Sequence, residues 1–146
     1  MATATTPTVY LDSNIVFYAA SADRSFGESC TRVLRDIQEG KVHAIASALI
    51  VAEVANTMRR AGRAKGMERV AAAMTSMPIR FYEVTDALAL EGVRLARESD
   101  LSPFDGIHAA TMLAAKVQTI VSTDTDFDRL GAVRRIDPRM HAIPEA

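Results

Sequence analysis

The sequence predicts an α/β fold in which helices cover both faces of a central, mostly parallel sheet of four to five strands. Short apolar segments rich in β-branched residues alternate with longer segments of helical periodicity. Capping residues, prolines and glycines fall at the ends of the helical segments. The 146 residues, 49% hydrophobic and 24% charged, suffice for one globular domain with a buried core.

The first half of the chain is predicted to contain three strands and four helices. Residues 8–11 are short, apolar and β-prone, which predicts a buried strand. Ser13 or Asn14 is expected to cap the helix that follows. Two later helices are expected to end at Gly40 and Gly62, because glycine is favoured just after a helix C-terminus. The predicted order is strand 8–11, helix 14–20, helix 27–38, strand 43–46, helix 47–61, helix 64–76 and strand 79–84.

The second half is predicted to contain two helices and two strands. Thr85 is expected to cap the first helix and Ser102 the second. Pro103 then takes the first helical position, where its missing N–H costs nothing. The predicted order is helix 86–99, helix 103–116, strand 119–122 and a short fifth strand over 134–136.

We expect a single domain over residues 8–137, with a loose N-terminal tail at 1–7 and a C-terminal tail at 138–146. The sequence has no signal-peptide pattern and no apolar run of the ~18 residues that a membrane span needs, so a cytoplasmic location is expected. The single cysteine, Cys30, excludes an internal disulfide and a cysteine-based metal site. The net charge of -1 does not by itself indicate a polyanionic partner.

Four acidic residues stand in otherwise apolar settings. Asp12 follows the first predicted strand and Asp124 follows the fourth, which is where parallel sheets place their ligand sites. Glu53 is the only charged residue in the segment 44–58. Asp105 lies in the first turn of its predicted helix. These positions make the four acids candidates for one shared site.

Each acid alone also has a structural explanation. Asp105 can complete a capping box with Ser102, Asp12 and Asp124 can be cap or turn residues, and Glu53 can face a buried arginine. As a group they repel, by about 3 kcal/mol for two carboxylates ~6 Å apart at an effective dielectric near 20. A cation would relieve that repulsion, and oxygen ligands in this number match Mg²⁺ or Mn²⁺ better than Zn²⁺.

The segments around the acids carry a resemblance to a known family. They are residues 9–14 (VYLDSN), 47–54 (SALIVAEV), 105–111 (DGIHAAT) and 120–127 (IVSTDTDF). In this order they resemble PIN domains, especially the VapC toxins of bacterial and archaeal toxin–antitoxin pairs. The resemblance extends over about residues 8–136. Gly106 departs from the pattern, in which alanine or another small residue is more usual, and we expect little consequence.

The resemblance implies a PIN-like domain that acts as a Mg²⁺- or Mn²⁺-dependent endoribonuclease. The implied catalytic and metal-binding residues are Asp12, Glu53, Asp105 and Asp124. Glu53 either ligates the metal or orients the attacking water. Asp126 is a further candidate ligand, which assists Asp124 or braces its loop. Asn14 and Thr123 are candidates to hold the carboxylates by hydrogen bonds, although cap and turn roles explain them equally well.

Substrate and partners follow from the same resemblance. Family members are held inactive by a cognate antitoxin and commonly form homodimers, which implies an RNA substrate, a VapB-like antitoxin and a homodimer. The candidate RNA-binding residues, at the end of the Glu53 helix, are Arg59, Arg60, Arg63 and Lys65. A solvated helix surface explains this cluster equally well. For His108, one turn after Asp105, a packed or surface position is favoured over a proton carrier.

Other functions are weighed against this interpretation. One is a non-catalytic PIN-fold module that binds RNA or protein, and another is a solitary RNA-processing PIN nuclease. The presence of all four acids argues against the first. A phospho-acceptor receiver domain is also α/β, but it needs an acidic pair after the first strand and a lysine after a late strand. Asp12 has no acidic neighbour, and the late lysine, Lys116, falls in a predicted helix.

Overall fold

The computed structural model describes residues 3–140 and contains a five-stranded sheet in which every pair of neighbouring strands is parallel. The strands are β1 (Thr8–Leu11), β2 (His43–Ser47), β3 (Ile79–Tyr82), β4 (Thr119–Val121) and β5 (Arg134–Ile136). Their spatial order is β3-β2-β1-β4-β5. The chain therefore builds outward from β1 to β3 and then restarts on the other side of β1. This reversal places a ligand site at the carboxyl ends of β1 and β4.

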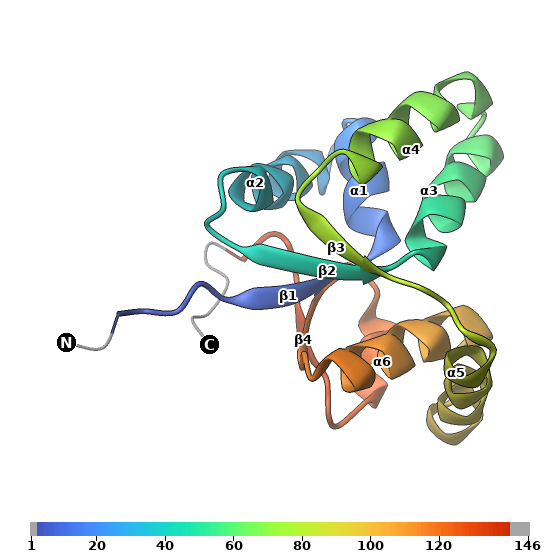
Figure 1. The fold of residues 1–146 in the computed structure, drawn as a ribbon. Coiled ribbons are helices and arrows are strands. Elements are labelled where there is room, and N and C mark those ends of the chain that lie inside the picture. Colours follow the sequence, from blue (N-terminus) through green and yellow to red (C-terminus); the bar gives the residue numbers. More distant parts are fainter. Residues whose placement is uncertain (1–2, 141–146) are drawn as a thin grey trace.

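Helices cover both faces of the sheet (Figure 1). On one face lie α1 (Ser13–Ala20), α2 (Gly27–Gln38), α3 (Leu49–Arg60) and α4 (Met67–Thr75). On the other lie α5 (Asp86–Ser99) and α6 (Pro103–Ala115). Two 3₁₀ turns, η1 (Ala64–Gly66) and η2 (Thr125–Arg129), complete the described elements. The predicted α/β architecture is confirmed.

The side chains of β1 alternate between two cores, because successive residues of a strand point to opposite faces. Val9 and Leu11 join the larger core, beneath α1 to α4. Tyr10 points the other way and packs with Met112 and Phe127. Tyr10 is fully buried, so its hydroxyl needs hydrogen-bond partners inside the protein.

Most predicted elements have the expected bounds, and the differences are local. The cap of α1 is Asp12, not Ser13 or Asn14. Ser47 ends β2, and its Oγ accepts a hydrogen bond from Leu49 N at 3.1 Å, so α3 begins two residues later than predicted. The helix predicted from residue 64 begins as the separate turn η1. The short turn η2 was not predicted, because five residues are too few for a periodic pattern.

Two glycines allow α5 and α6 to cross at close range. A Cβ on Gly92 would lie 2.7 Å from the backbone of Ile107. A Cβ on Gly106 would overlap the carbonyl oxygen of Gly92. The expectation that glycine at position 106 has little consequence is therefore wrong, because in this chain alanine would not fit without a shift of α5.

The predicted domain limits, 8–137, stay a prediction, and the outer ends of both predicted tails, residues 1–2 and 141–146, lie outside the described residues. Within the described part, Pro7 O accepts a hydrogen bond from His43 N at 2.9 Å. The guanidinium of Arg139 lies 4.7 Å from the centre of the Phe26 ring. None of the helices between residues 3 and 140 has the length and apolar character needed to cross a bilayer.

Candidate metal-binding active site

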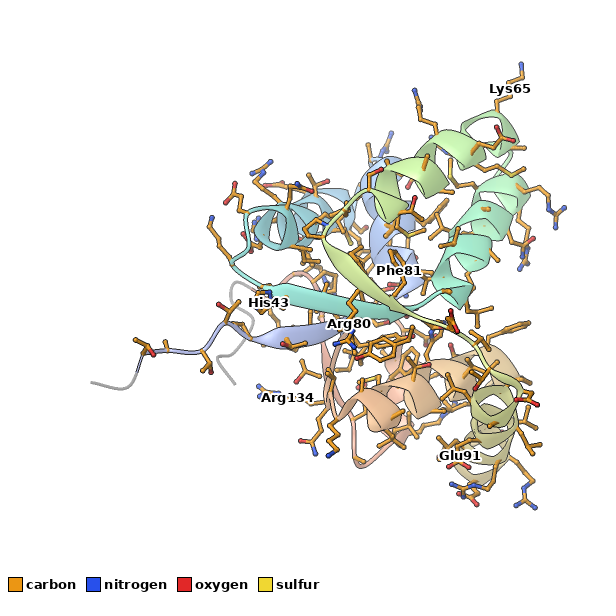
Figure 2. The ribbon with its side chains drawn as sticks, viewed as in Figure 1. His43, Lys65, Arg80, Phe81, Glu91 and Arg134 are labelled. Carbon is orange, nitrogen blue, oxygen red and sulfur yellow. The ribbon has the colours of Figure 1, made fainter. Side chains whose placement is uncertain are left out.

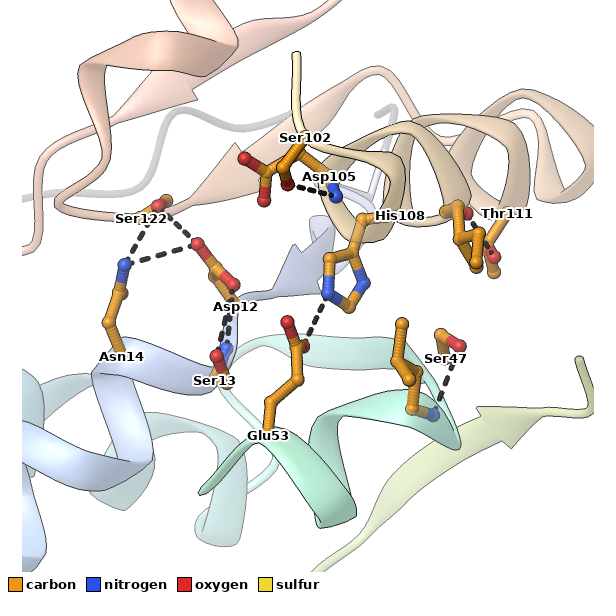
Figure 3. A network of polar contacts seen from close by, with 12 residues as sticks. Asp12, Ser13, Asn14, Ser47, Glu53, Ser102, Asp105, His108, Thr111 and Ser122 are labelled. Carbon is orange, nitrogen blue, oxygen red and sulfur yellow. Dashed lines mark hydrogen bonds and ion pairs between the residues drawn. The ribbon is translucent and has the colours of Figure 1, made fainter. Parts of the chain in front are cut away.

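Asp12 stands at the carboxyl end of β1, beside β4, and is 4% exposed. Its Oδ1 accepts a hydrogen bond from Ser13 N at 2.8 Å, which caps α1. Its Oδ2 accepts hydrogen bonds from Ser122 Oγ at 2.5 Å and from Asn14 Nδ2 at 3.1 Å (Figure 3). Burial raises the pKa of this carboxyl above its usual range, and the negative charge of Glu53 adds to that effect.

Ser122 links the ends of β1 and β4. Besides donating to Asp12, its Oγ accepts hydrogen bonds from Asp124 N at 3.0 Å and from Asn14 Nδ2 at 3.2 Å. Asn14 therefore contacts Asp12, as its predicted role requires. Thr123 contributes a backbone N–H, which donates to Asn14 Oδ1 at 3.4 Å, while its side chain makes no hydrogen bond within residues 3–140. The residue that braces the carboxylate is Ser122, directly after β4 and one position before the predicted Thr123.

Glu53 is held by a chain of buried polar groups from α6, β1 and β2. His108 Nε2 lies 2.5 Å from Glu53 Oε1, and His108 Nδ1 lies 2.6 Å from Tyr10 Oη. The Tyr10 hydroxyl in turn accepts a hydrogen bond from Ser47 N at 2.8 Å. Because that N–H can only donate, the hydroxyl proton is free to point at Nδ1, and the neutral imidazole then donates from Nε2 to Glu53.

This arrangement answers the question left open about His108. The residue is fully buried, so the packed position is confirmed. Burial alone would lower the pKa of the imidazole, but the hydrogen bond to Glu53 and the charges of Glu53 and Asp12 outweigh it and raise that pKa. His108 thus interacts electrostatically with the acids of the cluster. Its spacing from Asp105 in the sequence indicated a shared helix face but not this contact.

The remaining acids gather beside this group. Asp105, Asp124 and Asp126 offer ligand atoms that all lie within 4.8 Å of one another, and so do Asp12, Glu53 and His108. Burial raises the pKa of Asp105 to about 6, and the charges of Asp12 and Asp124 contribute. The four predicted acids therefore meet at one edge of the sheet as two adjacent groups of three, with His108 and Asp126 completing the sets.

The structural explanations for single acids account for part of this geometry. Ser102 Oγ accepts from Asp105 N at 3.1 Å and caps α6, but in the described part of the chain Ser102 N does not donate in return to the Asp105 carboxylate. Asp124 Oδ1 accepts from Asp126 N at 2.9 Å and caps η2. Glu53 faces a histidine rather than an arginine. These local roles leave carboxylate oxygens available to a further partner.

The donor set fits a hard divalent cation. Among residues 3–140, no arginine or lysine pairs with any of the four predicted acids, while Arg129 lies 3.4 Å from Asp126. Five carboxylates and one imidazole would otherwise share a half-buried edge of the sheet with little positive charge to balance them. Carboxylate oxygens in this number are typical ligands of Mg²⁺ and Mn²⁺.

A hollow of about 390 Å³ lies along α3, and of the four predicted acids Glu53 lines it. It begins at Ser13 and Glu53 and extends past Asn56 to Arg60, with Phe104 from α6 also lining it. It therefore joins Glu53, one member of the acidic cluster, to Arg60 at the end of α3.

Comparison with known proteins gives a family and a set of structural neighbours. The sequence profile described as PIN domain matches residues 9–133. No curated protein sequence matches the chain. Among solved structures, Mycobacterium tuberculosis VapC20, described as a toxin that cleaves the sarcin–ricin loop, has a TM-score of 0.72 at 18% identity, over 84% of this chain and 95% of that one.

Two further neighbours were solved as complexes. A toxin–antitoxin complex from Klebsiella pneumoniae gives a TM-score of 0.62 at 17% identity, over 89% of this chain and 97% of that one. The VapBC2 complex from Rickettsia felis, bound to a DNA fragment from its promoter, gives 0.66 at 15% identity, over 88% and 97%. These TM-scores show a shared fold, and at such low sequence identity they show the fold alone.

Proposed function

The chain belongs to the PIN domain family, and on that premise we propose that it is a toxin-type endoribonuclease that hydrolyses RNA phosphodiester bonds with a bound Mg²⁺ or Mn²⁺ ion. One observation carries the proposal: two adjacent groups of potential ligand side chains meet near the carboxyl ends of β1 and β4, and within residues 3–140 Asp12, Glu53, Asp105 and Asp124 have no arginine or lysine partner. A cation is what such a cluster lacks.

We assign Asp12, Asp105 and Asp124 as metal ligands, direct or through water, with Asp126 as a further candidate. A divalent ion bound there would lower the pKa of a water molecule and offset negative charge on the phosphate. Ser122 and Asn14 hold Asp12 in one orientation, which reduces the rearrangement needed to bind a cation. His108 fixes Oε1 of Glu53, which leaves Oε2 to ligate or to accept a hydrogen bond from the attacking water.

The basic end of α3 supports RNA as the substrate. Arg60 lines the same hollow as Glu53, one turn beyond Asn56. Lys65 projects into solvent at the far tip of the α3–α4 pair (Figure 2). No ion pair neutralises these side chains within the described part of the chain, so a phosphate backbone would meet uncompensated positive charge. The proposed backbone-binding residues are Arg59, Arg60, Arg63 and Lys65.

We further propose a VapB-like antitoxin as the inhibitor and a homodimer as the assembly. The toxin–antitoxin complexes from Klebsiella pneumoniae and Rickettsia felis share the fold and support the first of these. We also propose a cytoplasmic location, where the proposed RNA substrate is found.

The decisive test removes one charge from the cluster. Asp12→Asn keeps the shape of the side chain and its cap on α1, and we expect the loss of RNA cleavage to exceed ~100-fold, the upper end for residues that merely support metal ligands. Cleavage of a single-stranded RNA pool is compared with Mn²⁺, with Mg²⁺ and with EDTA, and Mn²⁺ binding is measured by titration calorimetry.

The matched control is Asp86→Asn, an exposed acid at the start of α5 whose Oδ1 only accepts from Ala87 N. It should cleave RNA as the unmodified protein does. If Asp12→Asn retains full activity and Mn²⁺ affinity, the site is wrongly assigned. If the unmodified protein binds no divalent ion, a non-catalytic binding module becomes the better interpretation.

A further inference from the structure

Phe104 is the one aromatic side chain that the fold leaves in the open. The chain has five phenylalanines, three tyrosines and no tryptophan, all within the described residues. Seven of these eight rings are buried or half-buried, whereas Phe104 is 56% exposed. A single exposed apolar side chain is ordinary on a protein surface, so exposure alone does not indicate a function.

The position of Phe104 is what distinguishes it. It directly precedes Asp105 in the first turn of α6, and it lines the hollow that contains Glu53. The start of α6 and helix α3 lie on opposite sides of the carboxyl edge of the sheet (Figure 1). Phe104 therefore shares the hollow with Glu53 and with the polar residues Asn56 and Arg60 of α3.

The rest of the hollow has the chemistry of a base-binding site. Asn56 and Thr57 provide amide and hydroxyl groups, and Arg60 provides a planar guanidinium. Arg59 donates to Asn56 Oδ1 at 2.9 Å, which leaves the amide protons of Asn56 available. Aromatic rings and guanidinium planes are the surfaces on which unpaired bases stack. The volume of about 390 Å³ lies at the small end of the ~300–1,000 Å³ range of ligand sites, which suits one nucleotide.

We propose that Phe104, with Asn56, forms a subsite that stacks one unpaired nucleobase next to the cleaved phosphate, while Arg60 in the same hollow contacts the RNA backbone. The inference rests on the proposed ribonuclease function and deepens it by defining the substrate. A base inside a continuous helix has both faces stacked on its neighbours, so only a base in a single strand, loop or bulge can enter. The subsite therefore selects RNA that is unpaired at the cleavage point.

A cycle that pairs protein and substrate changes tests the subsite. Single-turnover cleavage of a single-stranded oligoribonucleotide is compared with that of otherwise identical oligonucleotides, each lacking one base near the cleavage point. Phe104→Ala should slow cleavage of the intact oligonucleotide about 5- to 100-fold, the range of one lost base–aromatic stack. One abasic position in the oligonucleotide should slow cleavage by the unmodified protein to a similar extent. With that same abasic oligonucleotide, Phe104→Ala should cleave no more slowly than the unmodified protein. Phe104→Trp should restore the rate.

Two controls separate stacking from folding and from metal binding. Leu113→Ala removes another exposed apolar side chain from the same helix, 46% exposed and outside the hollow, and should leave cleavage unchanged. Mn²⁺ affinity of Phe104→Ala should equal that of the unmodified protein. The subsite is refuted if Phe104→Ala cleaves intact RNA at the normal rate. It is also refuted if Phe104→Ala is slower than the unmodified protein by the same factor on every abasic oligonucleotide.

Failure of the subsite can be told apart from failure of the nuclease proposal. If the unmodified protein cleaves no RNA, the proposed function fails, and the subsite is then judged by binding of single-stranded RNA that contains 2-aminopurine. Stacking on Phe104 should quench its fluorescence with the unmodified protein and not with Phe104→Ala. Absence of quenching would overturn the subsite. Normal cleavage by Phe104→Ala together with weaker inhibition by an antitoxin would assign the ring to protein docking instead.

Discussion

At the scale of single residues, the most consequential contact is one between a buried histidine and a half-buried glutamate. His108 orients Glu53 from within the core, and Tyr10 orients His108. Burial raises the pKa of the Tyr10 phenol, so it stays protonated and serves as a hydrogen-bond group only. Glu53 is thereby anchored through His108 to Tyr10 in β1, so a change at Tyr10 should alter the position of Glu53 in the acidic cluster.

Tyr10→Phe tests that anchoring. Removal of the hydroxyl leaves Ser47 N–H and His108 Nδ1 without partners inside the protein. An unsatisfied buried polar group costs ~1–3 kcal/mol, so we expect urea unfolding to show a loss of at least that size. RNA cleavage should fall about 10-fold or more, as when a group that supports a metal ligand is lost.

Tyr82→Phe is the matched control for this change. The Tyr82 hydroxyl makes no hydrogen bond to any residue between 3 and 140, and the ring is half-buried. Its removal should leave both unfolding and cleavage nearly unchanged. Equal stability of Tyr10→Phe and the unmodified protein would mean that the polar chain does not anchor Glu53.

At the scale of elements, the crossing of α5 and α6 positions the third acid. Gly106 directly follows Asp105, and it lies against the backbone of α5 at Gly92. Because both helices lack a side chain at this point, α6 packs closely on α5 directly after Asp105, which fixes the turn that carries this acid. The same crossing explains why a residue that weakens helices is found inside each helix.

Gly106→Ala should therefore destabilise the protein even though alanine is the better helix former. Helix propensity alone would favour alanine by up to ~1 kcal/mol, while overpacking typically costs ~1–3 kcal/mol and here involves backbone atoms that cannot rotate away. We expect a net loss of at least about 1 kcal/mol by urea denaturation, with reduced cleavage because Asp105 moves. Gly131→Ala, where an added Cβ meets nothing within 4 Å, should be close to neutral, and a stabilised Gly106→Ala would contradict the crossing.

At the scale of the whole molecule, unbalanced negative charge at the carboxyl edge links stability to pH and to metal. Asp12, Asp105 and His108 each hold a proton more tightly in the folded protein, since their pKa values are raised. For Asp105 the affected interval runs from its ordinary 3.8 to about 6. The metal-free folded state therefore binds more protons than the unfolded chain, and its stability falls as pH rises.

Thermal unfolding in EDTA should show this dependence directly. We expect the Tm to be at least ~3 °C higher at pH 5 than at pH 8, since ~1 kcal/mol corresponds to about 2–4 °C in a chain of this size. Saturating Mn²⁺ should remove the decrease, because the metal binds the deprotonated carboxylates. Asp105→Asn should flatten the profile in EDTA. A Tm that rises from pH 5 to pH 8 without metal would show that the acids are already neutralised by other groups.

Much of the architecture and the identity of the acids followed from local patterns. The caps Thr85 and Ser102 were predicted and are observed, because a cap acts over three or four residues of the same segment. The location of Asp12 and Asp124 after β1 and β4 followed from strand ends alone. Parallel sheets generally place their ligand sites at the carboxyl ends of their strands, so the sequence alone predicts that these two acids converge.

The partners of the acids were decided only by the tertiary structure. Ser122 meets Asp12 across 110 residues, and His108 meets Glu53 across 55. No periodicity reports contacts at such separations, because they depend on which strand lies beside β1 and on how closely α6 approaches the sheet. The sequence by itself determined which groups carry negative charge and on which elements they lie. Packing decided which of their oxygens are held by neighbours and which stay open to a cation, since hydrogen-bond geometry exists only once the layers have met.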